Sequence, residues 1–139
     1  MQLAIQEIRA VFTGICNKLF LGDISMEDKV KVLEEFLMEY EGVLDRKKNG
    51  QEGSYTKYLF DKGIDKILKK VGEECTEVII SSKEDNKEEQ VGEICDLTFH
   101  MFVLMAELNI SLEDVAAELS KRRNKKNNFK GERRPITNV

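Results

Sequence analysis

Four polar residues, Glu93, Asp96, His100 and Glu107, recur along the otherwise apolar segment 91–108. At 3.6 residues per turn, a helix would bring their side chains within roughly 60° of one another. A helix that is apolar over most of its circumference is typically buried. A buried carboxylate is costly unless a cation or hydrogen-bond donors offset its desolvation. The pattern therefore predicts that this line of acids binds a positively charged partner.

A second group of acids, Glu73, Glu74 and Glu77, precedes this segment in a stretch with its own helical periodicity. Both segments contain acids three residues apart, a spacing that places two carboxylates on adjacent positions of one helical face. Two helices joined by a short connection are most simply antiparallel neighbours, so Glu74 and Glu77 would face Glu93 and Asp96. Carboxylates that converge from two helices form an oxygen-rich site suited to Mg²⁺ or Mn²⁺.

An ordinary solvated helix face is the alternative interpretation of the earlier acids. Lys66, Lys70, Glu73 and Glu77 lie opposite the apolar stripe of their segment, as surface residues would. Glu74 differs because it borders that stripe. The acids of the later segment also have little solvated face available, because apolar residues cover the rest of its circumference. These two observations favour a metal site over a solvated surface.

Other residues near the acids carry less specific signals. The single histidine, His100, is more typical of a hydrogen-bonded residue that supports a site than of a metal ligand. Cys75 and Cys95 fall on apolar arcs, where we expect them to pack. Five lysines before the acids are suited to phosphate oxygens, although any one of them is interpreted equally well as a solvated helix lysine. They are Lys57, Lys62, Lys66, Lys69 and Lys70.

The spacing of apolar residues predicts the helices that must position these groups. The predicted helices span residues 3–20, 26–47, 64–82, 87–108 and 112–124, whereas residues 55–60 are predicted to be a loop or a single turn. Ser25 and Ser111 are the predicted N-caps, and Asn109 the predicted end of the fourth helix. The chain has one proline and is rich in Glu, Lys and Leu. We therefore expect an all-α fold, a helical bundle of about five helices.

Composition excludes several classes of protein. A chain of 139 residues with 41% hydrophobic content forms one domain. Its net charge of −4 combines a basic C-terminal end with an acidic body, which argues against broad nucleic-acid binding. Three cysteines without a CxxC spacing fit a reducing compartment. With no apolar run of membrane-spanning length and no cationic leader, we expect a cytoplasmic protein without a membrane partner.

Two long segments carry a resemblance to a known family. Residues 53–83, GSYTKYLFDKGIDKILKKVGEECTEVIISSK, resemble the core signature of the phosphoribosyl-ATP pyrophosphatase family, and residues 93–122, EICDLTFHMFVLMAELNISLEDVAAELSKR, continue it. The preceding VLEEFLMEYEGVLDRKKN resembles the first helix of that family, so the similarity covers about residues 30–123. The family is one of the all-α nucleotide pyrophosphatases, with the MazG-type and dimeric dUTPase-like enzymes. The resemblance therefore implies a MazG-like fold and a homodimer.

The resemblance also implies an activity and a set of site residues. The reaction is the Mg²⁺- or Mn²⁺-dependent hydrolysis of phosphoribosyl-ATP to phosphoribosyl-AMP and pyrophosphate, the second step of histidine biosynthesis. The family pattern, ExxE followed by ExxD, assigns the metal to Glu74, Glu77, Glu93 and Asp96. Glu73 or Glu77 would orient or deprotonate the attacking water. The nucleotide substrate would be bound by Lys66, Lys70, Lys62, Tyr55 and Thr56, and His100 would support the site.

Residues 1–28 exceed the usual domain of the family, and we interpret them as an added helix for packing or dimerisation. Residues 29–124 form the family-like domain, and residues 125–139 form a basic tail. Two other functions remain open. A MazG-type house-cleaning nucleoside triphosphate pyrophosphatase would share the carboxylate pattern, but the stretch 53–70 favours the histidine-pathway enzyme. A non-catalytic helical interaction module would use the same acids only for surface ion pairs.

Overall fold

The computed structural model describes residues 25–125, and these residues contain five α-helices and no strand, which confirms the all-α fold. None of the five combines the length and the apolar run that crossing a membrane requires. The predicted helix over residues 3–20 and nearly all of the predicted tail lie outside the described residues. The helices are α2 (Met26–Asn49), α3 (Tyr55–Lys62), α4 (Ile64–Ser81), α5 (Lys87–Leu108) and α6 (Leu112–Arg123).

The predicted helix ends are confirmed to within two residues, because the predicted caps form. The side chain of Ser25 accepts a hydrogen bond from the backbone N–H of Asp28 at the start of α2. Asn109 ends α5 in the left-handed conformation, with φ of 55°. Ser111 and Asp114 exchange hydrogen bonds at the start of α6, which is the reciprocal capping box.

The prediction for residues 55–60 was wrong, because this stretch belongs to a regular helix, α3. The Ser54 hydroxyl accepts a hydrogen bond of 3.3 Å from the backbone N–H of Lys57 and so caps the helix. Gly63 ends it with φ of 80°, a conformation that favours glycine because other residues carry a Cβ. Helix α4 begins at the next residue, so one glycine separates two helices of different direction.

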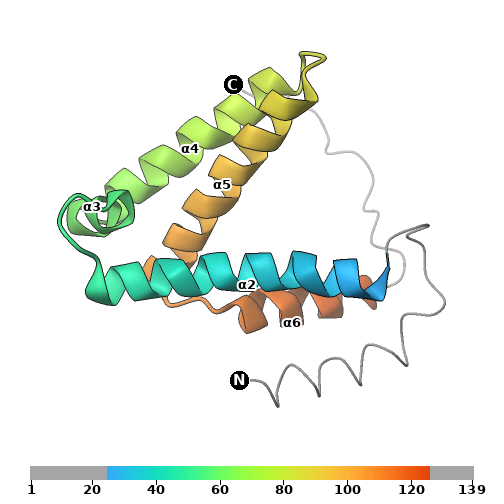
Figure 1. Ribbon diagram of the computed structural model, residues 1–139, viewed down its shortest axis with the longest axis horizontal. Helices are drawn as coiled ribbons and strands as arrows, with labels where there is room; N and C mark the ends of the chain where they lie inside the picture. The colour runs from blue at the N-terminus through green and yellow to red at the C-terminus, as the bar shows by residue number, and fades with distance from the viewer. Residues whose placement is uncertain (1–24, 126–139) are drawn as a thin grey trace, which may run out of the picture.

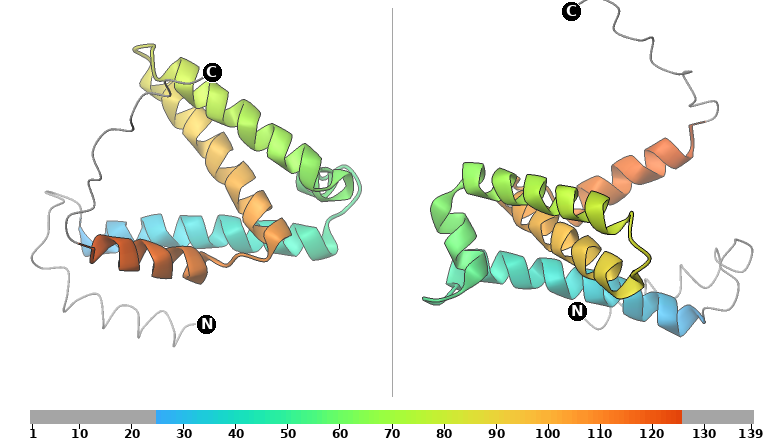
Figure 2. Two further views of the ribbon diagram at one scale, coloured as in Figure 1. Left: turned by 180° about the vertical axis from the view of Figure 1, so that it is seen from behind. Right: turned by 90° about the horizontal axis from the view of Figure 1, so that it is seen from above.

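The helices α4 and α5 form an antiparallel hairpin that meets α2 at a steep angle, and α3 connects the C-terminal end of α2 to α4 (Figure 1). The antiparallel pairing of α4 and α5 was predicted from their short connection. In the view from above, α6 leaves the end of α5 and diverges from α2 (Figure 2). The core lies where α2 to α5 converge, around four fully buried side chains: Val43, Leu59, Ile67 and Val103.

Lysine 47 joins the end of α2 to the end of α5. Its Nζ donates a hydrogen bond of 2.8 Å to the carbonyl oxygen of Ala106 and lies 2.9 Å from a carboxylate oxygen of Glu107. The same ammonium group lies 5.1 Å from the centre of the Phe60 ring. A cation at the C-terminal end of a helix interacts favourably with its unpaired carbonyls. Glu107, the last acid of the predicted polar line, therefore has a structural partner far from the other acids.

The prediction that segment 91–108 is buried on all sides is wrong: the buried residues of α5 lie in its C-terminal half, and even there Met101 and Leu108 are 39% and 51% exposed. Val91 and Ile94 in the other half are 51% and 52% exposed. Cys75 and Cys95, which we expected to pack, are exposed as well. The reason is that α4 covers one side of α5, whereas α2 crosses only near its C-terminal half (Figure 1). The buried residues of α5 are His100, Phe102, Val103, Met105 and Ala106.

Candidate active site

Three of the predicted metal ligands converge between α4 and α5. Glu74 and Glu77 from α4 and Glu93 from α5 each offer a carboxylate oxygen, and these oxygens lie within 4.8 Å of one another. The antiparallel hairpin produces this convergence, because it places acids three residues apart on α4 opposite the first acid of the ExxD pair on α5. In the described part of the chain, no other group of three potential ligand residues meets this condition. An oxygen-only set of this kind fits Mg²⁺ or Mn²⁺.

Asp96, the fourth predicted ligand, is not part of this group. It lies one turn after Glu93 on α5, is exposed, and lines a groove of about 400 Å³ between α2 and α5. Glu35 and Glu39 of α2 line the same groove, together with apolar residues. The structure therefore places Asp96 beside the cluster, and its role as a ligand stays a prediction.

Glu74 is the buried acid of the site, with only 4% of its surface exposed. Its carboxylate lies 2.6 Å from the ammonium group of Lys70 and 3.7 Å from Nδ1 of His100. Burial alone would raise the pKa of Glu74, but hydrogen bonds from Lys70 and Glu77 and the charge of Lys70 outweigh it, so the pKa lies below its usual value. In turn, the hydrogen bond to Glu74 raises the pKa of Lys70. The pair is therefore held in its ionised form.

The two candidates for activating water, Glu73 and Glu77, differ in their proton affinity. Hydrogen bonds from Lys70 and Lys69 lower the pKa of Glu73, whose oxygens lie 3.1 Å and 3.3 Å from these ammonium groups. The pKa of Glu77 is raised, first by its hydrogen bond with Glu74 and then by the negative charge of that carboxylate. Glu77 is therefore the better proton acceptor of the two.

His100 links this site to α3, and its role in supporting the site stays a prediction. Its Nδ1 lies 2.8 Å from the backbone oxygen of Asp96, which can only accept, so Nδ1 carries the proton. The other ring nitrogen, Nε2, then accepts a hydrogen bond of 3.1 Å from the hydroxyl of Tyr55. Burial raises the pKa of the Tyr55 phenol and keeps this donor protonated. Among the described residues, no buried side-chain nitrogen or oxygen lacks a hydrogen-bond partner.

The residues predicted to bind substrate fall into two groups. Lys62 and Lys66 lie 5.8 Å and 6.0 Å from the centre of the Tyr58 ring, beside Tyr55, and all are accessible. Thr56, by contrast, is 5% exposed and offers almost no surface to a ligand, so its predicted substrate contact is not supported. The cause is the helical form of α3, which turns Thr56 towards the core.

Two aromatic residues beside the site were missed by the sequence reasoning. Both stack on the ring of Tyr55. The ring centre of Tyr58 lies 6.2 Å from that of Tyr55, and the ring centre of Phe99 lies 6.3 Å from it. Tyr58 stands three residues after Tyr55, which is the spacing of side chains on one helical face. That signal was usable only once residues 55–62 were assigned to a helix.

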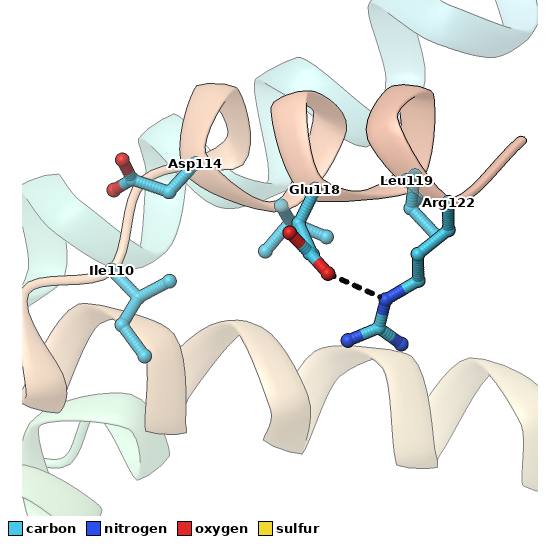
Figure 3. A pocket seen from close by; sticks show the side chains of 6 residues that line it. Ile110, Asp114, Glu118, Leu119 and Arg122 are labelled. Atoms are coloured by element: carbon cyan, nitrogen blue, oxygen red, sulfur yellow. Dashed lines mark hydrogen bonds and ion pairs between the residues drawn. The ribbon is translucent and has the colours of Figure 1, made fainter. Parts of the chain in front are cut away.

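A separate pocket of about 280 Å³ lies along α6, between Ile110, Val115 and Leu119 (Figure 3). Glu118 and Arg122 at its wall pair with each other, because Nε of Arg122 lies 2.8 Å from a carboxylate oxygen of Glu118, and the third charged residue, Asp114, bonds Ser111. The pocket thus lacks the converging acids found between α4 and α5. The α4–α5 hairpin is therefore the candidate active site.

Comparison with known proteins shows which family the chain belongs to. The family model described as phosphoribosyl-ATP pyrophosphohydrolase matches residues 37–123, which include the carboxylate cluster, Lys70 and His100. The chain belongs to this family. The match extends from the middle of α2 to the end of α6, so it covers α3, α4 and α5 completely.

Two curated relatives agree with the family model over nearly their whole length. The chain is 56% identical to the phosphoribosyl-ATP pyrophosphatase of Clostridium novyi (strain NT) and 58% identical to that of Clostridium acetobutylicum; each match covers 81% of this chain and 99% of the relative. It is also 54% identical to the histidine biosynthesis bifunctional protein HisIE of Caldanaerobacter subterraneus, over 72% of this chain and 47% of that protein. In that relative, the similar region is about half of a longer protein.

The burial of Glu74 predicts the effect of removing its cation. Replacing Lys70→Met should lower the free energy of unfolding by about 2 kcal/mol, less than for a fully buried pair because the Lys70 side chain is 21% exposed. The double variant Lys70→Met with Glu74→Gln should recover much of this loss, since no charge is then left buried. Urea denaturation in the presence of EDTA measures both. Lys69→Met is the matched control, because Lys69 is 65% exposed and contacts only Glu73 in this cluster. Equal stabilities of the two single variants would contradict the role of Lys70.

Proposed function

We propose that this protein hydrolyses phosphoribosyl-ATP to phosphoribosyl-AMP and pyrophosphate, the second step of histidine biosynthesis, in the cytoplasm. Membership of the family and the names of the relatives support this reaction. The observation that carries the proposal is the cluster of Glu74, Glu77 and Glu93, which lies inside the matched region and beside lysines suited to phosphate. A triphosphate brings several negative charges, so a site that binds it needs cations as well as carboxylates.

The cofactor in this proposal is Mg²⁺ or Mn²⁺, held by Glu74, Glu77 and Glu93. The geometry supports the fit: the donors are all carboxylate oxygens, they lie within 4.8 Å of one another, and a cation between them would balance their charge. When bound, such an ion neutralises phosphate oxygens and stabilises the pyrophosphate that leaves.

The residues of the chain then have distinct roles. Glu77 accepts the proton of the attacking water, because the carboxylate of Glu73 is already paired with the ammonium groups of Lys69 and Lys70. Lys70 holds the Glu74 carboxylate in place and keeps it ionised, and its contacts with Glu73 and Glu74 leave it less available for phosphate than Lys66. The reaction consumes one water and breaks one phosphoanhydride bond, with the proton passing through Glu77 to solvent.

The direct test of the activity is hydrolysis by the purified full-length chain with Mg²⁺. Phosphoribosyl-ATP should yield phosphoribosyl-AMP and pyrophosphate, and EDTA should abolish the release. Nucleoside triphosphates such as dUTP or ATP, at equal concentration, should be hydrolysed far more slowly. Preferential hydrolysis of ordinary triphosphates would instead indicate a house-cleaning pyrophosphatase, and no hydrolysis of either kind would indicate a non-catalytic helical module.

Metal binding can be tested without turnover. Glu77→Gln and Glu93→Gln should each weaken Mn²⁺ binding, measured by calorimetric titration, by at least about tenfold, since each removes one charged ligand of three. Asp96→Asn should weaken it less, because Asp96 lies outside the cluster. Glu88→Gln, an exposed acid at the start of α5, is the matched control and should leave binding unchanged. Unchanged affinity in Glu77→Gln and Glu93→Gln would exclude this metal site.

We also propose that the protein is a homodimer in which a second copy covers the groove between α2 and α5. The groove is lined by Phe36, Ile94, Phe99 and Phe102 among other residues. Large apolar side chains also remain about half exposed on α2 near this groove, and the residues of one chain that the structure describes do not cover them. They are Val32, Leu33, Phe36, Leu37 and Met38.

Disruption of the dimer provides the check. Wild-type protein should have twice the monomer mass by light scattering, and Ile94→Asp should shift it towards the monomer, because the charge would be buried in the interface. Leu119→Asp on α6 is the matched control: Leu119 is 54% exposed and Ile94 52% exposed, but Leu119 lies outside the groove. Circular dichroism should show the same helix content for both variants. A monomeric wild-type protein, or a dimer that Ile94→Asp leaves intact, would contradict the proposal.

A further inference from the structure

We propose that Tyr55, Tyr58, Lys62 and Lys66 form a second subsite that binds the end of the substrate remote from the triphosphate. In this subsite, the tyrosine pair takes the adenine ring and the two lysines take the phosphate of the phosphoribosyl group. This inference rests on the proposed function. It assigns to the two lysines the distinction between phosphoribosyl-ATP and ATP, because ATP lacks the second ribose phosphate.

The tyrosine pair is an exposed aromatic surface held in a fixed orientation. The rings of Tyr55 and Tyr58 stack with an interplanar angle of 22°, and the two residues are 47% and 42% exposed. The Tyr55 ring is fixed from two further sides, by stacking on Phe99 and by its hydrogen bond to His100. Exposed aromatic rings that are already ordered bind nucleobases by stacking, since every base presents a flat π-face.

The lysines beside this surface differ from their neighbours in charge pairing. Lys57, Lys69 and Lys70 each have a carboxylate within 3.3 Å. For Lys62 and Lys66, in the part of the chain that the structure describes, the ammonium group instead makes a cation–π contact with the Tyr58 ring. Two ammonium groups within about 6 Å of one ring repel each other, and a phosphate between them would remove that repulsion.

The position of the subsite matches an extended substrate. Helix α4 carries Lys66, Lys70, Glu74 and Glu77 in sequence, so its surface changes from basic to acidic along one direction. Glu77 follows Lys66 by eleven positions, which at 1.5 Å per residue corresponds to about 16 Å along the helix axis. Tyr55 connects the two regions, because its hydroxyl bonds His100, which lies 3.7 Å from Glu74. A nucleotide with phosphates at both ends can thus bind the acids through a metal and the lysines directly.

The reaction product distinguishes binding of the second ribose phosphate from binding of the triphosphate. Phosphoribosyl-AMP keeps the base and the second ribose phosphate but lacks the pyrophosphate that leaves, and AMP lacks the second ribose phosphate as well. The wild-type full-length chain with Mg²⁺ should bind phosphoribosyl-AMP more tightly than AMP in calorimetric titrations. Lys62→Ala and Lys66→Ala should each weaken phosphoribosyl-AMP binding by about tenfold and leave AMP binding unchanged, the size expected for one charge-assisted contact.

Two further variants complete the design. Tyr58→Leu should weaken both ligands to a similar extent, because both carry the adenine ring. Lys83→Ala, an exposed lysine just after the end of α4, is the matched control and should change neither affinity. Circular dichroism of each variant would verify that its helices are intact.

The possible outcomes separate this inference from the proposed function, because hydrolysis of phosphoribosyl-ATP is measured on the same wild-type preparation. If the wild type hydrolyses phosphoribosyl-ATP but the lysine variants keep full affinity for phosphoribosyl-AMP, the subsite is wrong and the function stands. The same conclusion follows if the variants lose AMP and phosphoribosyl-AMP equally, or if the wild type does not prefer phosphoribosyl-AMP. Absence of hydrolysis would reject the proposed function itself, whereas selective loss of phosphoribosyl-AMP binding would support the subsite.

Discussion

The ionised carboxylate of Glu74, buried between α4 and α5, is the interaction on which the site depends. A buried carboxylate without partners would be too costly, so its surroundings must supply positive charge and hydrogen bonds. Lys70 supplies the charge from one turn earlier on the same helix, at 2.6 Å. His100 supplies a polar neighbour from α5 at 3.7 Å, and its own ring is fixed by Tyr55. One buried acid thereby couples α3, α4 and α5.

This constraint also explains why the neighbouring acids differ in character. The hydrogen bond with Glu74 and then the charge of that carboxylate raise the pKa of Glu77, while hydrogen bonds from Lys70 and Lys69 lower that of Glu73. Two acids four residues apart on one helix therefore become a proton acceptor and a stably ionised group without any difference in side-chain chemistry. The same helix, α4, also carries the change from a basic residue at Lys66 to an acidic residue at Glu77.

Much of the fold could be predicted from the sequence, because caps such as Ser111 and Asn109 and the apolar periodicity act locally. The burial of the acids on α5 was harder to predict. The all-round apolar pattern of segment 91–108 indicated burial of Glu93 and Asp96, but burial depends on which helices cross α5, and its N-terminal half is exposed. Helix α3 was missed because its few apolar residues show no long periodicity. Its signals were Ser54 and Gly63, a cap at each end.

The convergence of Glu74, Glu77 and Glu93 into one metal site is the central claim, and anomalous X-ray scattering from crystals grown with Mn²⁺ tests it most directly. The arrangement predicts a strong anomalous peak coordinated by carboxylate oxygens of these three residues, with Lys70 still in contact with Glu74. A peak at other residues, or no peak between α4 and α5 at saturating Mn²⁺, would contradict it.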